Sequence, residues 1–236
     1  MLGHMKDAMM EPDVISFNVG ISACEKGRQW QQALSLMSRL AEWQVHPNII
    51  YTTPISYNAA ISACEKCGQW QVALLLFGEI RESHFEPDVI SYNAGVSACE
   101  KGGRWQQALL LLRGARLSQI ELDTTSYNAG ISACEKGMRW QRALSLLCDM
   151  EGIKLDRDAT SYNAVIRACD KSGQWQQVLS LLSCMGEARH ELDALSCKAG
   201  ISACEDGSQW QHALLLMSDI EGLKIWHAGE MRKQLL

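Results

Sequence analysis

The sequence predicts an all-α fold, a right-handed α-solenoid of about six tandem antiparallel helical hairpins. Near copies of residues 91–105 recur along the chain, around Asn18, Asn58, Asn128, Asn163 and, in diverged form, Lys198. The tryptophans mark a period of 35 residues: Trp70, Trp105, Trp140, Trp175 and Trp210. A period of about 20 to 50 residues is typical of solenoids, in which each repeat packs only on its neighbours.

Each repeat is counted from the fourth residue before its asparagine or, in the last repeat, before Lys198. The repeats then cover residues 14–53, 54–88, 89–123, 124–158, 159–193 and 194–228. Residues 1–13 match the end of a further repeat, so we expect the chain to begin within an array. Residues 229–236 are expected to form a C-terminal tail. Repeat 1 has five extra residues, which we place near 48–54, because Pro47 and Pro54 disfavour helix for the residue before each of them.

Repeat 3 (89–123) shows the elements expected in every repeat. Asp88 is a suitable N-cap, and the first helix of the hairpin should end at about Lys101. Gly102 and Gly103 then provide a turn. The second helix should run from about residue 104 to residue 116, with apolar residues at helical spacing.

The first helix carries an apolar stripe that should be buried. In repeat 3, Tyr92, Val96 and Cys99 are spaced four and three residues apart. The cysteine recurs in all six repeats, as Cys24, Cys64, Cys99, Cys134, Cys169 and Cys204. We expect these thiols to pack as small apolar groups in a reducing compartment. Gly95, unfavourable in mid-helix, should mark the close approach of a neighbour, and the tryptophans should wedge between hairpins.

Composition and motifs exclude several classes of function. The net charge of −5 gives no general attraction for nucleic acid. No apolar run approaches the roughly 18 residues of a membrane span, so no membrane association is expected. The histidines fall at unrelated repeat positions, and no Ser-His-Asp set, paired carboxylates or phosphate-binding glycine loop is present. We expect no enzymatic activity, cofactor or metal site, and the single Cys-x-x-Cys at Cys64 and Cys67 is insufficient for zinc.

The repeats resemble those of the pentatricopeptide repeat family, with uniform, P-type-like repeats of 35 residues. The resemblance rests on Tyr92-Asn93 near the start of the first helix, Glu100-Lys101-Gly102-Gly103 at the turn, and Trp105 at the start of the second helix. It covers about residues 1–228. Tetratricopeptide repeats form the same hairpin with a period of about 34 residues, but their tryptophan lies in the first helix.

A second face of the first helix is mostly polar. In repeat 3 it carries Ile90, Asn93, Ser97 and Lys101, spaced three, four and four residues apart. Stacking would align such residues in rows: Asn18, Asn58, Asn93, Asn128 and Asn163; Lys26, Lys66, Lys101, Lys136 and Lys171; and Ile15, Ile55 and Ile90. Regular amides and ammonium groups suit a single-stranded polynucleotide. Five phosphate contacts would give a salt slope of about −3.5.

The resemblance implies that each repeat binds one RNA base through its fifth and last residues, and that an Asn with an Asp favours uracil. The implied pairs are Asn58 with Asp88, Asn93 with Asp123, Asn128 with Asp158, and Asn163 with Asp193. It also implies that Ile55 and Ile90 wedge between bases, at the position where later repeats have Thr125 and Thr160. The expected footprint is about four consecutive uracils, with one or two undefined positions.

Repeats 1 and 6 depart from this pattern. In repeat 1, Asn18 has either Asn48 or Thr53 as its partner. Repeat 6 has Lys198 with Ala228, and Asp206 replaces the lysine of the row. We expect repeat 6 to be structural or to contact phosphate only.

Other interpretations remain open. The asparagines could bond the neighbouring repeat, and the lysines, each directly after an acidic residue, could form a locally compensated, solvated face. The preferred function is single-stranded RNA binding, and the resemblance implies a role in RNA processing, stability or translation in a chloroplast or mitochondrion. The alternatives are a scaffold that binds a protein partner on its concave surface, or a recent duplication with weak or no binding.

Overall fold

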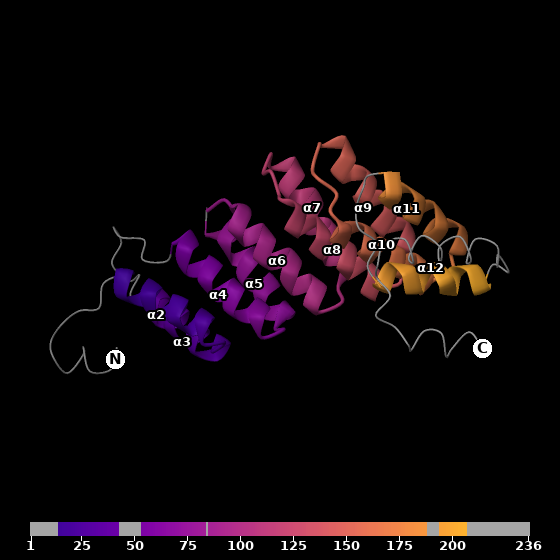
Figure 1. Ribbon diagram of the computed structural model, residues 1–236. Helices are drawn as coiled ribbons and strands as arrows, with labels where there is room; N and C mark the ends of the chain where they lie inside the picture. Colours follow the sequence, from indigo (N-terminus) through magenta and orange to yellow (C-terminus); the bar gives the residue numbers. More distant parts are fainter. Residues whose placement is uncertain (1–13, 43–52, 84, 188–193, 207–236) are drawn as a thin grey trace. The chain divides into compact units, whose positions relative to one another are not determined.

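The structure, a computed structural model, describes residues 14–42, 53–83, 85–187 and 194–206 (Figure 1). Within them it contains helices and no strand. The first helices of the hairpins are α2 (Val14–Lys26), α4 (Pro54–Lys66), α6 (Val89–Lys101), α8 (Thr124–Lys136), α10 (Ala159–Asp170) and α12 (Ala194–Asp206). The second helices are α3 (Trp30–Glu42), α5 (Trp70–Glu82), α7 (Trp105–Leu117), α9 (Trp140–Gly152) and α11 (Trp175–Glu187). The predicted all-α fold of tandem helical hairpins is confirmed.

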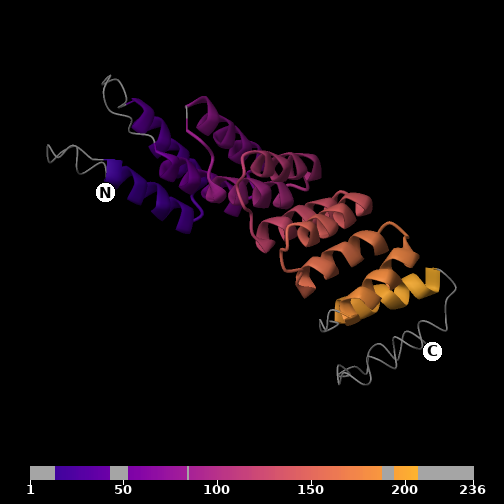
Figure 2. The same cartoon turned by 90° about the horizontal axis from the view of Figure 1, so that it is seen from above.

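The chain divides into two compact parts, residues 1–133 and 134–236, and each is described by itself. In the first part, α2, α4 and α6 pack side by side, and α3 and α5 each contact the first helix that follows them (Figure 2). In the second part, α10 packs against α12, and α9 and α11 contact the following first helix in the same way. Within each part, a hairpin therefore completes its core with the next one.

The helix boundaries follow local signals. Asp88 caps α6, because its carboxylate accepts the Ser91 N–H at 2.9 Å, and α6 ends at Lys101 before Gly102, as predicted. The second helix α7 begins and ends one residue later than predicted. The predicted first residue, Arg104, instead has non-helical dihedrals of −98° and 68°.

The turn within each hairpin has one constant conformation. The fifteenth residue of the repeat has a positive φ in every hairpin whose turn is described: Arg28 (54°), Gly68 (70°), Gly103 (63°), Met138 (53°) and Gly173 (66°). Only glycine adopts this region without a steric penalty. Three hairpins have glycine there, whereas repeats 1 and 4 carry the penalty.

The predicted apolar stripe is buried. In α6, Tyr92, Val96 and Cys99 are 4, 0 and 0 % exposed. Burial raises the pKa of the Cys99 thiol to about 12, and burial with the neighbouring Cys67 raises the pKa of Cys64 to about 11. Thiols with such pKa values are protonated at neutral pH and are poor nucleophiles. They act as packing groups, and all ten cysteines are free.

Two close approaches explain recurring features of the repeat. A Cβ atom on Gly95 would lie 3.0 Å from Leu111 Cδ1, so the expected close neighbour is present. A Cβ atom on Gly102 would lie 2.4 Å from Cδ1 of Trp70, and the Arg104 guanidinium lies 4.3 Å from the Trp70 ring centroid. Trp70 is therefore a wedge between hairpins, as predicted.

Several predicted features lie outside the described residues. They are the repeat end at 1–13, most of the insertion in repeat 1 with Asn48, the repeat-closing residues Asp193 and Ala228, and the tail at 229–236.

Candidate nucleic-acid interface

The aliphatic row is exposed. Ile15, Ile55 and Ile90 are 70, 64 and 60 % exposed, and Thr125 and Thr160 are exposed at the same position of later repeats. Single exposed apolar residues are common on proteins. Exposure at one position of three consecutive repeats instead provides a regular series of apolar contact points.

Asn58 and Asp88 lie side by side where repeat 2 meets repeat 3. Asn58 Nδ2 is 3.0 Å from each carboxylate oxygen of Asp88, and Asn58 Oδ1 accepts a hydrogen bond from Ser91 Oγ at 2.6 Å. Ser91 is fully buried, whereas Asp88 is exposed. We call these three residues, and their equivalents where other repeats meet, a junction cluster.

The junction cluster is a by-product of helix capping. Asp88 and Ser91 form the capping box of α6, in which Ser91 Oγ accepts the Asp88 N–H at 3.2 Å. The same two side chains contact the asparagine of the preceding first helix. Local capping signals of one repeat therefore position a side chain of the repeat before it.

The cluster recurs at other junctions. Ser126 Oγ donates to Asn93 Oδ1, and the Ser126 N–H donates to Asp123 at 2.9 Å. In the second part, Ser196 Oγ donates to Asn163 Oδ1, while the partner expected for Asn163 lies outside the described residues.

The pair predicted for repeat 4 is divided between the two compact parts. Asn128 belongs to the first part and is half-buried. Asp158 belongs to the second part, where it caps α10 by accepting the Ser161 N–H at 2.8 Å.

Thr53 takes the place of the aspartate at the end of repeat 1. It caps α4 in a capping box with Ser56. Asn18 Nδ2 donates a long hydrogen bond of 3.5 Å to Thr53 Oγ1, and Asn18 Oδ1 accepts one from Ser56 Oγ. Of the two candidate partners of Asn18, the structure thus places Thr53 beside it.

The asparagines are less accessible than their partners. Asn58 and Asn163 are 6 and 8 % exposed, and the other three of the row are half-buried. Asp88 and Asp123 are exposed. These contacts agree with the interpretation in which asparagines bond the neighbouring repeat, and their base-reading role stays a prediction.

Three lysines of the row, Lys66, Lys101 and Lys171, form ion pairs with acidic residues of the preceding repeat. Lys66 Nζ lies 2.7 Å from Glu25 Oε1, and Lys101 Nζ lies 2.6 Å from Glu65 Oε1. A serine one turn earlier on the lysine's helix also donates to the same carboxylate, as Ser97 does to Glu65 at 2.8 Å. We call these contacts the carboxylate ladder. The remaining lysines of the row, Lys26 of repeat 1 and Lys136 of repeat 4, are exposed.

In the second part, one acidic residue of the carboxylate ladder, Glu135, contacts two cationic side chains. Glu135 accepts from Arg167 at 3.0 Å and from Lys171 at 2.8 Å, and its side chain is 9 % exposed. Burial alone would raise the pKa of Glu135, but the hydrogen bonds and charges of Arg167 and Lys171 lower that pKa below its ordinary value of 4.5.

No arrangement for metal chemistry or membrane insertion is found in the described part of the chain. No three or more His, Cys, Asp and Glu side chains are placed there to hold a metal ion, and none of the described helices has the length and apolar character needed to cross a membrane. Cys67 Sγ donates to the backbone oxygen of Arg28 at 3.2 Å, which gives this thiol a structural contact.

Sequence reasoning missed the serines of the junction cluster. They are the third residue of repeats 2 to 6: Ser56, Ser91, Ser126, Ser161 and Ser196. Two signals were available, their spacing of one repeat and their position three residues after a helix cap.

Known proteins resemble the chain at the level of repeat and fold. A family model described as PPR repeat matches residues 55–85, 125–155 and 160–190, and the search of curated proteins found no match. The crystal structure of the pentatricopeptide repeat protein PPR10 from maize has a TM-score of 0.65 and 19% identity, covering 93% of this chain and 31% of that one. The structure of PPR10 in complex with an 18-nt psaJ RNA element gives the same TM-score and identity, covering 90% and 34%.

A shorter structure matches over most of its own length. The PPR domain of Arabidopsis thaliana protein-only RNase P 1, in complex with tRNA, has a TM-score of 0.67 and 12% identity, covering 74% of this chain and 92% of that one. The chain spans about a third of the length of the maize protein. At these identities the likeness concerns the fold, and the three matched segments each begin at the second residue of repeats 2, 4 and 5.

Proposed function

Because this chain carries pentatricopeptide repeats, we propose that it binds single-stranded RNA, with one base contacted by each repeat. The observation that carries the proposal is the repeated junction cluster beside an exposed isoleucine, as at Asn58, Asp88 and Ile90. The relatives solved with an RNA element and with tRNA support the class of ligand.

The chemistry of the cluster suits a base. A base has an apolar face and a polar edge, and the exposed isoleucines provide an apolar contact for the face. The amide of Asn58 can donate and accept, while the Asp88 carboxylate can only accept. We propose uracil as the preferred base of the Asn–Asp repeats, on the family resemblance, and an organellar transcript as the target on the same ground.

The lysine row would contact the backbone. Lys66 and Lys101 keep 38 and 39 % of their side chains exposed, although each pairs with a glutamate. A phosphate that reaches them must share the ammonium group with that carboxylate. We therefore expect a modest electrostatic share in binding and a salt slope shallower than about −3.5.

Homopolymer binding tests the proposal directly. Oligo-U should bind more tightly than oligo-A or oligo-C, and added salt should weaken all binding. Equal and negligible binding of all three would overturn the RNA-binding proposal.

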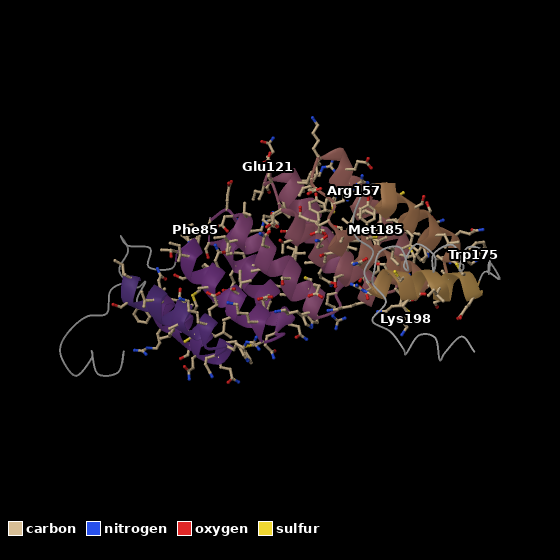
Figure 3. The ribbon with its side chains drawn as sticks, viewed as in Figure 1. Phe85, Glu121, Arg157, Trp175, Met185 and Lys198 are labelled. Atoms are coloured by element: carbon tan, nitrogen blue, oxygen red, sulfur yellow. The ribbon has the colours of Figure 1, made fainter. Side chains whose placement is uncertain are left out.

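A double variant tests the base-reading residues. Changing Asn93→Thr and Asn128→Thr together should reduce the preference for uracil at two adjacent positions, by about tenfold in oligo-U affinity relative to oligo-C. Lys198→Ala is the control, because Lys198 is an exposed residue of α12 at the same repeat position (Figure 3), and it should leave the preference unchanged. A preserved preference in the double variant would remove the base-reading role from these asparagines.

A further inference from the structure

We propose that the serine at the third position of each repeat is a positioning residue, which fixes the orientation of the preceding repeat's asparagine amide and thereby its base preference. The proposal rests on the proposed RNA binding. It concerns Ser56, Ser91, Ser126 and Ser196, the serines whose contacts with an asparagine are described.

An asparagine amide can turn by 180° at little steric cost, because its oxygen and nitrogen ends have nearly the same shape. The turn exchanges a hydrogen-bond acceptor for a donor. Uracil and cytosine differ in the same sense, since uracil has the acceptor O4 where cytosine has a donor amino group. An amide that turns freely would therefore discriminate poorly between the two pyrimidines.

At Asn58 the two partners impose one orientation. The Asp88 carboxylate only accepts, so it selects the nitrogen end, which lies 3.0 Å from both of its oxygens. The Ser91 hydroxyl is 2.9 Å from Asp88 Oδ1 but only 2.6 Å from the other end of the amide, and it donates to this nearer oxygen. Ser91 is itself held by the capping box of α6 and is fully buried, so water does not replace its hydroxyl.

The serine donates to the oxygen end at every junction where the contact is described. Each of the four serines is at most 3 % exposed. The partner at the nitrogen end varies, because repeat 1 has Thr53 where repeat 2 has Asp88. The threonine hydroxyl can donate as well as accept, and its contact with Asn18 is long, at 3.5 Å. The orientation of Asn18 therefore depends mainly on Ser56.

The test compares two pairs of serines on the same helices of the full chain. Ser91→Ala with Ser126→Ala removes the donors to Asn58 and Asn93. The matched control, Ser97→Ala with Ser132→Ala, removes hydroxyls that donate to Glu65 and Glu100 instead. Affinities for oligo-U and oligo-C are measured at one salt concentration, below the thermal unfolding transition of every variant.

The first pair should lower the ratio of oligo-U to oligo-C affinity about tenfold. The control pair changes contacts of the carboxylate ladder, which is proposed to act on the RNA backbone, so it should change both affinities by the same factor and leave the ratio unchanged. Ser91→Thr with Ser126→Thr keeps both hydroxyls and should restore the ratio. If the alanine pair does not fold, Ser91→Cys with Ser126→Cys keeps the volume with a weaker donor, and a smaller fall in the ratio is expected.

Two outcomes overturn the proposal and are distinguishable. A wild-type protein that prefers oligo-U, with the same ratio in the alanine or cysteine pair, overturns the positioning role and leaves RNA binding intact. A wild-type protein that binds neither oligonucleotide overturns the proposed function and the positioning role with it.

Discussion

In each hairpin turn that the structure describes, the fifteenth residue of the repeat has a positive φ whatever its side chain. Gly103 and Met138 both adopt this conformation, at 63° and 53°. For a residue with a Cβ atom the left-handed region costs about 1 kcal/mol. The hairpin imposes the conformation because the turn must return the chain against the first helix.

Met138→Gly should therefore stabilise the protein by about 1 kcal/mol, measured as the free energy of unfolding in urea. Met138 is 65 % exposed, so little packing is lost. The reverse change, Gly103→Met, should destabilise by a similar amount, because a Cβ atom there meets nothing within 4 Å and only the backbone cost remains. Equal stability of Met138→Gly and wild type would contradict the assigned cost.

Single residues with strong local preferences were predictable. Asp88 before an apolar helix and the glycines after Lys101 marked both ends of α6, and the spacing of Cys99 marked its buried face. The left-handed Met138 was not predictable from its residue type, because methionine disfavours that region. The burial of Asn58 was also missed, since it depends on Ser91 from the next repeat.

The carboxylate ladder joins neighbouring helices through groups that titrate. In the second part, Glu135 in the last turn of α8 contacts Arg167 of α10 and Lys171, which directly follows α10. The lowered pKa of Glu135 means that the folded state favours the charged carboxylate. The resulting stabilisation is present above the ordinary pKa of 4.5 and is lost as pH falls through the lowered folded-state pKa.

Glu135→Gln should destabilise the protein by about 1 kcal/mol at pH 7, because two cations lose their shared carboxylate. The difference from wild type should shrink as pH falls below about 4.5, in urea unfolding at a series of pH values. Glu121→Gln, at the exposed Glu121 (Figure 3), is the control and should change stability by less than about 0.5 kcal/mol. A difference that grows at low pH would contradict the assigned ion pairs.

The ladder also bears on RNA binding. Glu25→Gln with Glu65→Gln should release Lys66 and Lys101 from their carboxylate partners. The proposed function then gives several-fold tighter binding of oligo-U and a steeper salt slope. These effects are measured by titration at several salt concentrations.

A matched double variant distinguishes the effect of the carboxylate ladder from the effect of net charge. Glu79→Gln with Glu82→Gln changes the charge equally on exposed residues of α5. An equal gain in oligo-U affinity for both double variants would mean that net charge causes the effect. It would contradict the competition between ladder carboxylates and RNA phosphates for the lysines.

Contacts between elements were harder to predict than the elements themselves. The sequence places an acidic residue directly before each lysine of the row, as Glu100 before Lys101. This spacing suggested that the adjacent carboxylate compensates the charge of the lysine. Successive helical residues point about 100° apart, so Lys101 instead meets Glu65 of the preceding hairpin. The period of the lysines was visible in the sequence, whereas the identity of their partners required the packing of α4 against α6.

At the scale of the whole molecule, the hairpins within each compact part depend on their neighbours through equivalent junctions. Deleting residues 89–123, one full period, would place Thr124 after Asp88 and Ser126 three residues after that cap, as Ser91 is now. We therefore expect a helical, cooperatively folded chain with a footprint one nucleotide shorter, measured by circular dichroism and by binding to oligo-U of increasing length.

A deletion that breaks the hairpin is the control. Removing residues 89–101 deletes α6 alone, so α7 loses the first helix that it packs against and no capping box follows Asp88. This variant should lose helicity or aggregate. Equal folding of the two deletions would contradict the dependence on in-register junctions.

The capping box that spans two repeats has a consequence for how such genes change length. Asp88 closes one repeat by sequence, yet its side chain belongs to the helix of the next and to the asparagine of its own. Unequal crossing-over between two in-register copies would rebuild this three-residue contact wherever the exchange occurred. Recombination could then add or remove repeats while every new junction keeps the contact found at the existing ones. The number of RNA bases contacted would change by one for each repeat gained or lost.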